Sequence, residues 1–193
     1  MANNDRNAYP TVKIGNQVWM AENLKTTKYR NGDAITKVTE KTKWAKLSSG
    51  GCCAYSNNEE YVETYGYLYN WYAVNDSRNI APEGWHVPTD SEWTQLTSYL
   101  GGKSVAGGKL KSTSGWDEFN LEITNESGFS ALPGRFCNYN GNFYGLTGNA
   151  YFWSASEFGS TYAWGRYLNF NNAYVFRHNY YKECGFSARL LRD

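Results

Sequence analysis

The chain has 193 residues, with 19 Lys plus Arg against 18 Asp plus Glu, which gives a formal net charge of +1. This length is typical of one domain, so we expect residues 1–193 to form a single domain with a sizeable core. The near-neutral charge disfavours a nucleic-acid partner or an acidic membrane surface. No apolar run approaches the roughly 20 residues of a membrane span, so we expect no membrane insertion.

Tyrosine, asparagine and glycine dominate the composition, with 17 Tyr, 21 Asn and 19 Gly against 4 Pro. Tyr, Asn, Gly and Ser are also enriched in antibody binding loops, where they combine contact area with adaptable hydrogen bonding. The composition therefore predicts a loop-rich recognition surface and disfavours a helical bundle or a typical α/β enzyme. The first nine residues are polar, so we expect no signal peptide within this sequence.

The cysteine and histidine spacing predicts no metal site. The four cysteines are Cys52, Cys53, Cys137 and Cys184. They form no CxxC pair and no zinc-ligand spacing, and the two histidines, His86 and His178, lie far apart in sequence. Adjacent Cys52 and Cys53 cannot easily bridge each other, and either could pair with a third cysteine. The favoured interpretation is reduced, partly buried thiols.

The first half of the chain predicts short elements separated by turns. Residues 11–19 alternate apolar and polar side chains around Gly15-Asn16, which indicates a β-hairpin. A second turn is expected at residues 31–33, and the polar residues 41–51 are typical of a surface loop. Apolar and aromatic residues at helical spacing predict a short helix within 66–74, and residues 81–84 contain the Pro and Gly that end it.

A helix is expected over residues 90–100. Thr89 and Glu92 have the spacing of a capping box, in which each side chain accepts a hydrogen bond from the backbone of the other. Apolar residues then repeat at i, i+3 and i+7: Trp93, Leu96 and Leu100. Gly101-Gly102 supplies a helix stop.

After Gly102 the sequence predicts strands and turns, with no helix. The expected strands are Ala131–Phe136, Tyr151–Ser154, Ala163–Asn169, Tyr174–Arg177 and Phe186–Leu191. Two short helices followed by a β-rich second half indicate an α+β fold without a linker that would divide it.

Several segments, in this order, resemble one family. They are IGNQVWMAENLKTTKYRNGDAI (14–35), YLYNWY (67–72), GWHVPTDSEWTQL (84–96), SGFSAL (127–132), FWSASE (152–157) and GFSARLLRD (185–193). Together they resemble the Fibrobacter succinogenes major paralogous domain family, from about Val12 to Asp193. That family is similar to the formylglycine-generating-enzyme branch of the C-type lectin fold. The resemblance implies two helices packed on twisted antiparallel strands, with the N- and C-terminal strands paired.

The resemblance does not imply an enzyme here, because fold alone does not fix function. Formylglycine-generating enzymes hold copper with two cysteines near the C-terminus, whereas this stretch has only Cys184, and Cys137 lies far upstream. We interpret His86 as a buried, hydrogen-bonded structural residue rather than a base, and Asp117-Glu118 as a solvated pair. The EPN, QPD and WND motifs of calcium-dependent lectins are absent. We therefore expect no catalytic residues, no metal and no cofactor.

Residues 151–184 carry an unusual density of aromatic side chains. Twelve of these 34 residues are Phe, Trp or Tyr, and only Thr161 and Val175 are β-branched. The aromatic residues lie beside Asn, Gly and Ser, which is unlike a buried hairpin. We therefore expect many of these rings to lie on the surface.

A second resemblance gives this window a function. Many domains with this fold are variable proteins of diversity-generating retroelements, in which replaced template adenines diversify Asn codons. Most residues of the window, about 152–184, are types that a diversified Asn codon can encode. Trp164, Lys182 and Glu183 are not among these types and are expected to be framework. The predicted contact residues are Phe158, Ser160, Thr161, Tyr162, Tyr167, Asn169, Phe170, Asn171, Asn172, Tyr174, Phe176, His178, Asn179, Tyr180 and Tyr181.

Within this set the residue types suggest different roles. The expected anchors are Tyr162, Tyr167, Tyr174, Phe176, Tyr180 and Tyr181, because aromatic residues supply large contact area at low entropy cost. Asn171, Asn172, His178 and Asn179 are expected to orient the ligand. Arg166 and Arg177 are expected to brace the scaffold.

The sequence therefore predicts a non-catalytic ligand-binding module whose partner is a protein or a surface glycan. We expect it at a cell surface, secreted, or on a phage virion. The alternatives are a relative of the formylglycine-generating enzymes, an adhesion module, and an ordinary paralogous domain whose Tyr/Asn-rich strands are only surface.

Overall fold

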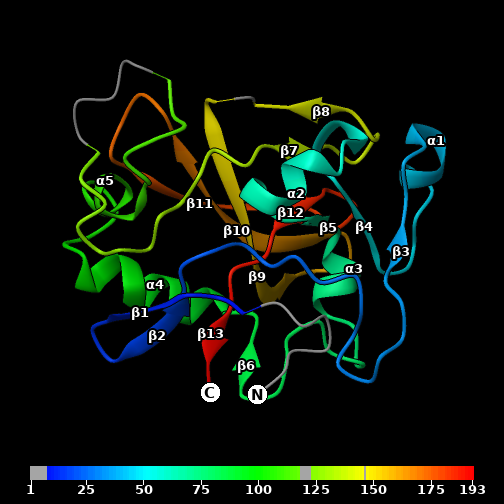
Figure 1. Cartoon of the computed structure of the whole chain (residues 1–193), viewed down its shortest axis with the longest axis horizontal. Coiled ribbons are helices and arrows are strands. Elements are labelled where there is room, and N and C mark those ends of the chain that lie inside the picture. The colour runs from blue at the N-terminus through cyan, green and yellow to red at the C-terminus, as the bar shows by residue number, and fades with distance from the viewer. Residues whose placement is uncertain (1–7, 118–122, 146) are drawn as a thin grey trace.

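The computed structural model describes residues 8–117, 123–145 and 147–193 and has a mixed α+β fold, mostly sheet with a few short helices (Figure 1). The helices are α1 (Lys41–Trp44), α2 (Glu60–Tyr65), α3 (Trp71–Val74), α4 (Asp90–Tyr99) and α5 (Ala106–Leu110), with a 3-10 turn, η1 (Tyr55–Asn57). The strands are β1 (Thr11–Ile14), β2 (Gln17–Met20), β3 (Thr36–Lys37), β4 (Gly51–Cys53), β5 (Leu68–Tyr69), β6 (Trp85–His86), β7 (Phe136–Cys137), β8 (Phe143–Tyr144), β9 (Asn149–Phe158), β10 (Tyr162–Asn169), β11 (Val175–Tyr181), β12 (Phe186–Ser187) and β13 (Leu191–Arg192).

The strands form one large and two small sheets. The large sheet has the order β11-β10-β9-β12-β5-β4-β3, so β11 is an edge strand. The second sheet has the order β1-β2-β13-β6, and β7 pairs with β8. Figure 1 shows α4 and α5 toward one end of the fold and α1, α2 and α3 toward the other.

The terminal strands pair as the family resemblance implies. The predicted hairpin is present: β1 pairs with β2 around Gly15, whose φ of 61° suits a residue without a Cβ. Strand β13 lies between β2 and β6, where Leu191 pairs with both Trp19 and His86. This sheet therefore joins the beginning, the middle and the end of the described chain.

Helix α4 confirms the predicted helix, and both hydrogen bonds of the capping box at Thr89 and Glu92 are present. Its apolar face is buried: the ring of Trp93 lies 4.9 Å from Trp19, 5.8 Å from Phe129 and 5.6 Å from Phe152. Aromatic contacts of this kind hold α4 firmly against β2 and β9. The helix thus forms a fixed wall beside the long strands.

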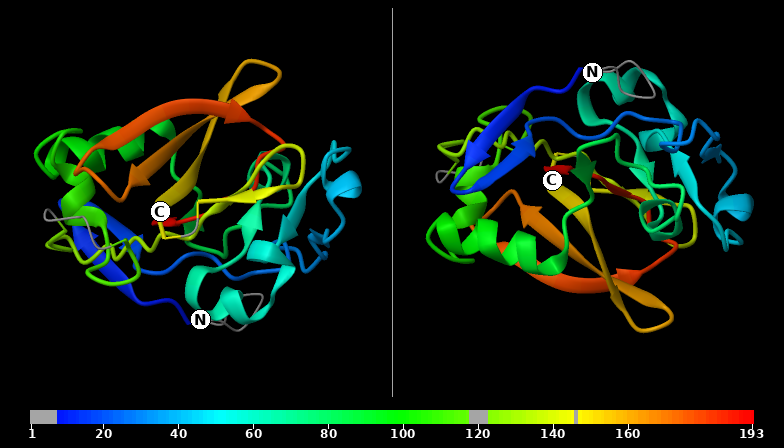
Figure 2. Two further views of the ribbon diagram at one scale, coloured as in Figure 1. Left: turned by 90° about the horizontal axis from the view of Figure 1, so that it is seen from above. Right: turned by 90° about the horizontal axis from the view of Figure 1, so that it is seen from below.

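Strands β9, β10 and β11 are the longest, and β10 lies between the other two. Side chains alternate between two faces along β10, where Leu168 is buried and Tyr167 is half-buried. A bulge between Ala163 and Gly165 interrupts the pairing with β9. Figure 2 shows the β9–β10 turn projecting from the body of the fold.

Three expectations about helices need correction. Residues 41–44 form α1 because Trp44 is buried and its ring N–H donates to Glu183 O at 2.9 Å. The helix expected within 66–74 is shorter, because Leu68 and Tyr69 form strand β5 before α3 begins. Helix α5 lies where no helix was expected, and Gly107 there allows close backbone contact, since a Cβ would lie 2.6 Å from Ala173 O.

The strands expected in the second half are largely present with shifted boundaries. Residues 131–136 differ more: 131–135 contain only isolated bridges, Arg135 has a φ of 68°, which a regular strand does not allow, and only Phe136 belongs to a strand, β7. The expected strand over 186–191 is split into β12 and β13, which belong to different sheets.

Candidate ligand-binding surface

A row of aromatic rings crosses β9, β10 and β11. Tyr167 pairs with Tyr151 of β9 and with Phe176 of β11, so the three side chains share one face. The ring centroid of Tyr167 lies 5.4 Å from Tyr151 and 4.3 Å from Phe176, with the planes 18° and 8° apart. Tyr174 continues the row at 4.7 Å from Phe176. We call these four half-buried residues the aromatic row.

Strands β7 and β8 extend the aromatic row. Phe136 lies 4.5 Å from Tyr151, and Tyr144 lies 5.7 Å from Phe136, with its ring exposed. Phe136 and Tyr144 were not among the predicted contact residues, although 136–144 (FCNYNGNFY) shows the same mixture of aromatic residues and Asn as the 151–184 window. That shared composition is the signal that could have found them.

A second group of rings lies near the projecting β9–β10 turn. Tyr162 and Tyr181 are cross-strand partners with centroids 4.7 Å apart, and Tyr139 lies 5.1 Å from Tyr181. Phe158 lies 4.7 Å from Trp164. Phe158, Tyr139 and Tyr181 are exposed. We call these five residues the tip cluster.

None of the predicted contact residues is fully buried. The exposed ones are Phe158, Ser160, Thr161, Asn171, His178 and Tyr181. The half-buried ones are Tyr162, Tyr167, Asn169, Phe170, Asn172, Tyr174, Phe176, Asn179 and Tyr180. They do not gather into one patch, since the eight residues of β10 span about 25 Å between the turns at its ends.

Tyr180 differs from the other expected anchors because its ring faces the core. It lies 4.8 Å from Phe186, 5.9 Å from Tyr151 and 6.4 Å from Trp153. Burial raises the pKa of Tyr180 strongly. Its contacts are those of a packing residue, and Tyr181 beside it carries the exposed ring.

The Asn-rich turn between β10 and β11 is held largely by its own side chains. The Asn169 side chain accepts from Asn171 N at 3.0 Å, and the Asn172 side chain accepts from Tyr174 N at 2.9 Å. The fully buried Lys111 donates to the carbonyls of Asn169 and Asn172 from below. Sequence reasoning missed Lys111, because a lone lysine in a polar stretch gives no sign of burial.

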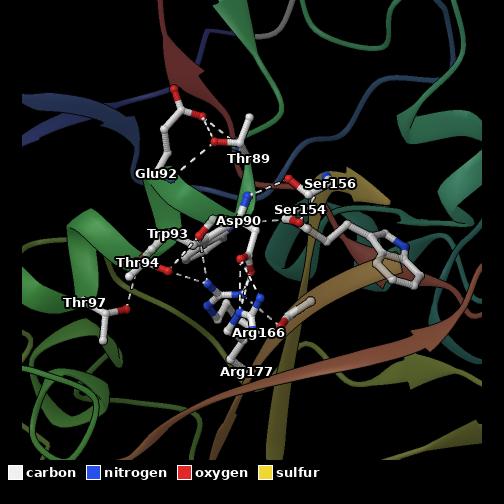
Figure 3. A network of polar contacts seen from close by, with 12 residues as sticks. Thr89, Asp90, Glu92, Trp93, Thr94, Thr97, Ser154, Ser156, Arg166 and Arg177 are labelled. Atoms are coloured by element: carbon white, nitrogen blue, oxygen red, sulfur yellow. Dashed lines mark hydrogen bonds and ion pairs between the residues drawn. The ribbon is translucent and has the colours of Figure 1, made fainter. Parts of the chain in front are cut away.

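Asp90 joins α4 to the long strands through two arginines (Figure 3). Arg166 donates to the carboxylate of Asp90 at 2.7 Å and to the hydroxyl of Thr94 at 3.1 Å. Arg177 donates to the same carboxylate at 2.9 Å and lies over the ring of Trp164 at 3.4 Å. Burial alone would raise the pKa of Asp90, but the bonds from Arg177 and Arg166 hold it below its usual range. The prediction that both arginines brace the scaffold is confirmed.

His86 is hydrogen-bonded, as predicted, but its ring is half-buried and not buried. Its ring nitrogens lie 2.6 Å from a carboxylate oxygen of Asp193 and 3.0 Å from one of Glu92. Burial alone would lower the pKa of His86, but the two carboxylate partners raise it overall. The ring therefore ties the α4 capping box to the end of the second sheet.

None of the four cysteines forms a disulfide, and all four are buried. Cys137 lies beside Cys184, since its N–H and C=O both pair with Gly185, so a second thiol does lie near Cys184. Burial raises the pKa of Cys184 to about 12. Within the described residues, no group of three or more His, Cys, Asp or Glu could hold a metal ion. Of the carboxylate pair at 117–118, Glu118 lies outside the described residues.

These observations define an α+β protein whose long antiparallel strands carry half-buried and exposed rings and are braced by α4 through Asp90. The chain belongs to the Fibrobacter succinogenes major domain family, whose model matches residues 12–192. Comparisons with curated proteins and with solved structures gave no significant match. In the part of the chain that the structure describes, no helix has the length and apolarity to cross a bilayer.

Proposed function

We propose that this protein is a non-catalytic ligand-binding module with a C-type lectin-like scaffold, and that it is the variable protein of a diversity-generating retroelement. Its target is a protein or a surface glycan, met at a cell surface or from a phage virion. The observation that carries the proposal is the separation of the predicted contact residues from the buried framework residues along β10 and β11. Every predicted contact residue there is exposed or half-buried, with Tyr180 packed toward the core, whereas the interleaved Ala163, Arg166, Leu168 and Val175 are buried.

This separation would allow the surface to change while the core stays constant. Two long paired strands fix the backbone, and the framework side chains face α4 or the core. Aromatic residues held on such a rigid support bind with little loss of entropy. Truncating a ring near the centre of an interface typically costs about 2 kcal/mol of binding free energy. The aromatic row and the tip cluster are the parts of the surface that fit this role.

The framework residues support the retroelement reading. Trp164, Lys182 and Glu183 cannot arise from diversified Asn codons, and each makes a structural contact. Trp164 packs under Arg177, buried Lys182 pairs with Glu157, and Glu183 accepts from the Tyr72 hydroxyl at 2.9 Å. The three residues that diversified Asn codons cannot encode thus each make a contact within the scaffold.

The decisive genetic test is the DNA around the gene. We expect a near-copy of the codons for residues 152–192 close by, differing mainly at adenines and accompanied by a reverse-transcriptase gene. If the region holds neither, the retroelement proposal fails, and binding must be tested on the protein alone.

Two displayed libraries would test the binding surface directly. The first diversifies the exposed positions Ser160, Thr161, Asn171, His178 and Tyr181, and the matched control diversifies an equal number of framework positions. The control positions are Ala163, Gly165, Arg166, Leu168 and Val175. Most members of the first library should melt cooperatively and yield binders to unrelated targets, and most members of the second should not fold. Equal loss of folding in both libraries would refute the proposal.

A further inference from the structure

A groove with a volume of about 570 Å³ lies between α4 and the edge strand β11. One wall is formed by α4, which presents the hydroxyls of Thr94 and Ser98. The other is formed by Tyr174 and Phe176, which are also the outer end of the aromatic row. This volume is in the range of sites that enclose a small molecule, and it is too small for a folded partner.

The groove is cationic. Among its described lining residues, Lys103, Arg166 and Arg177 are positively charged and none is acidic. Asp90 balances part of this charge, because its carboxylate accepts from both Arg166 and Arg177. The groove therefore keeps an excess of positive charge that favours an anionic ligand.

Two of the cations are accessible. Arg177 directs its Nε and one Nη to Asp90, yet 46% of its side chain is exposed. Lys103 lies at the surface with its ammonium 5.5 Å from the centre of the Tyr174 ring. The hydrogen bond to Tyr174 raises the pKa of Lys103, so its charge persists at neutral pH.

We propose that this groove binds an acidic sugar, with the carboxylate held by Lys103 and Arg177 and the sugar ring against Tyr174. The flat faces of aromatic rings suit the C–H face of a sugar, and the Thr94 and Ser98 hydroxyls suit its hydroxyl groups. The volume favours one or two sugar units over a peptide, which would need a longer contact surface. This inference rests on the proposed ligand-binding function and narrows it to one class of ligand.

The test uses two pairs of saccharides that differ in a carboxylate: α-1,4-digalacturonate against α-1,4-galactobiose, and sialyllactose against lactose. Binding to the full chain is followed by calorimetric titration at low salt. At least one acidic member should bind tenfold or more tightly than its neutral partner, and rising NaCl should weaken it. Lys103→Gln should reduce this preference below twofold, whereas Lys46→Gln, at an exposed lysine beyond α1, should leave it unchanged.

Several results would overturn the acidic-sugar site. These are equal binding of acidic and neutral saccharides, no binding of either acidic saccharide, or a preference that survives both Lys103→Gln and Arg177→Gln. Binding of a polyglutamate peptide or inorganic phosphate in place of the saccharides would also overturn it. The first library diversifies only positions outside the groove. If that library yields binders and the saccharide titrations fail, the acidic-sugar site is rejected and the ligand-binding module is retained.

Discussion

The two faces of strands β10 and β11 differ in how their side chains are held. Toward α4, Leu168 and Val175 are buried, and the charge of Arg166 is paired with Asp90. On the other face, Tyr167 and Phe176 stack on each other and remain half-exposed. Contacts across the sheet to α4 depend on particular partners, whereas ring-on-ring contacts accept other side chains of similar size. The comparison teaches that one hairpin can hold the fold and offer a replaceable surface.

The largest effect is expected from Asp90→Ala. Removing the carboxylate leaves Arg166 buried without its ion-pair partner, which should lower the free energy of unfolding by about 3 kcal/mol. Denaturant titration measures this loss, and Asp33→Ala, at an exposed ion pair with Arg78, should have little effect. Similar losses in the two variants would show that the buried ion pair on the α4 face contributes no more to stability than an exposed one.

Neighbouring residues on opposite faces give the sharpest contrast. Leu168→Ala leaves a cavity in the core and should lower the free energy of unfolding by about 3 kcal/mol. Tyr167→Ala removes a half-exposed ring and should lower it by about 1 kcal/mol. Thermal unfolding of both variants checks the order, and a larger loss at Tyr167 would contradict the assignment of the faces.

Lys111→Met tests the support beneath the β10–β11 turn. The carbonyls of Asn169 and Asn172 lose a charged donor, so we expect a loss of about 2 kcal/mol and faster amide exchange within 169–174. The control is Lys109→Met, which removes a lysine from the same helix whose partner Glu126 is exposed. Unchanged exchange in the turn would mean that its Asn side chains suffice to hold it.

The smallest effect is expected from the pH dependence at His86. Its pKa in the folded protein lies above the usual histidine value of about 6.5, because Asp193 and Glu92 favour the charged ring more than burial disfavours it. The stabilisation is therefore fully present below about pH 6.5 and is lost as the pH rises through the folded pKa. The melting temperature of the native chain should fall toward that of His86→Gln across this interval, and a constant difference between them would contradict the prediction.

Local signals in the sequence predicted the parts of the fold that depend on near neighbours. The capping box at Thr89 and the glycine turn at Gly15 involve contacts within three residues, and both are present. The α+β class followed from the order of the predicted helices and strands, and the pairing of the terminal strands followed from the family resemblance. By contrast, α5 depends on close approach of Gly107 to Ala173, which local periodicity does not encode.

The candidate site was predicted in part for the same reason. Aromatic density in the 151–184 window located the rings of β10 and β11, but it could not show that Tyr180 faces the core. Phe136 and Tyr144 join the row through strands far away in sequence. Lys103 and Ser98 reach the groove only because α4 lies beside β11. Each of these positions is set by tertiary contact.

The position of β13 has a consequence for the synthesis of the protein. Leu191 lies between Trp19 and His86, so the second sheet cannot close until residues 191–192 have left the ribosome. A stop codon introduced anywhere in the 152–184 window would remove this strand and leave β2 and β6 unjoined. Only chains translated through residues 191–192 can reach the native state, so truncated chains would fail at folding.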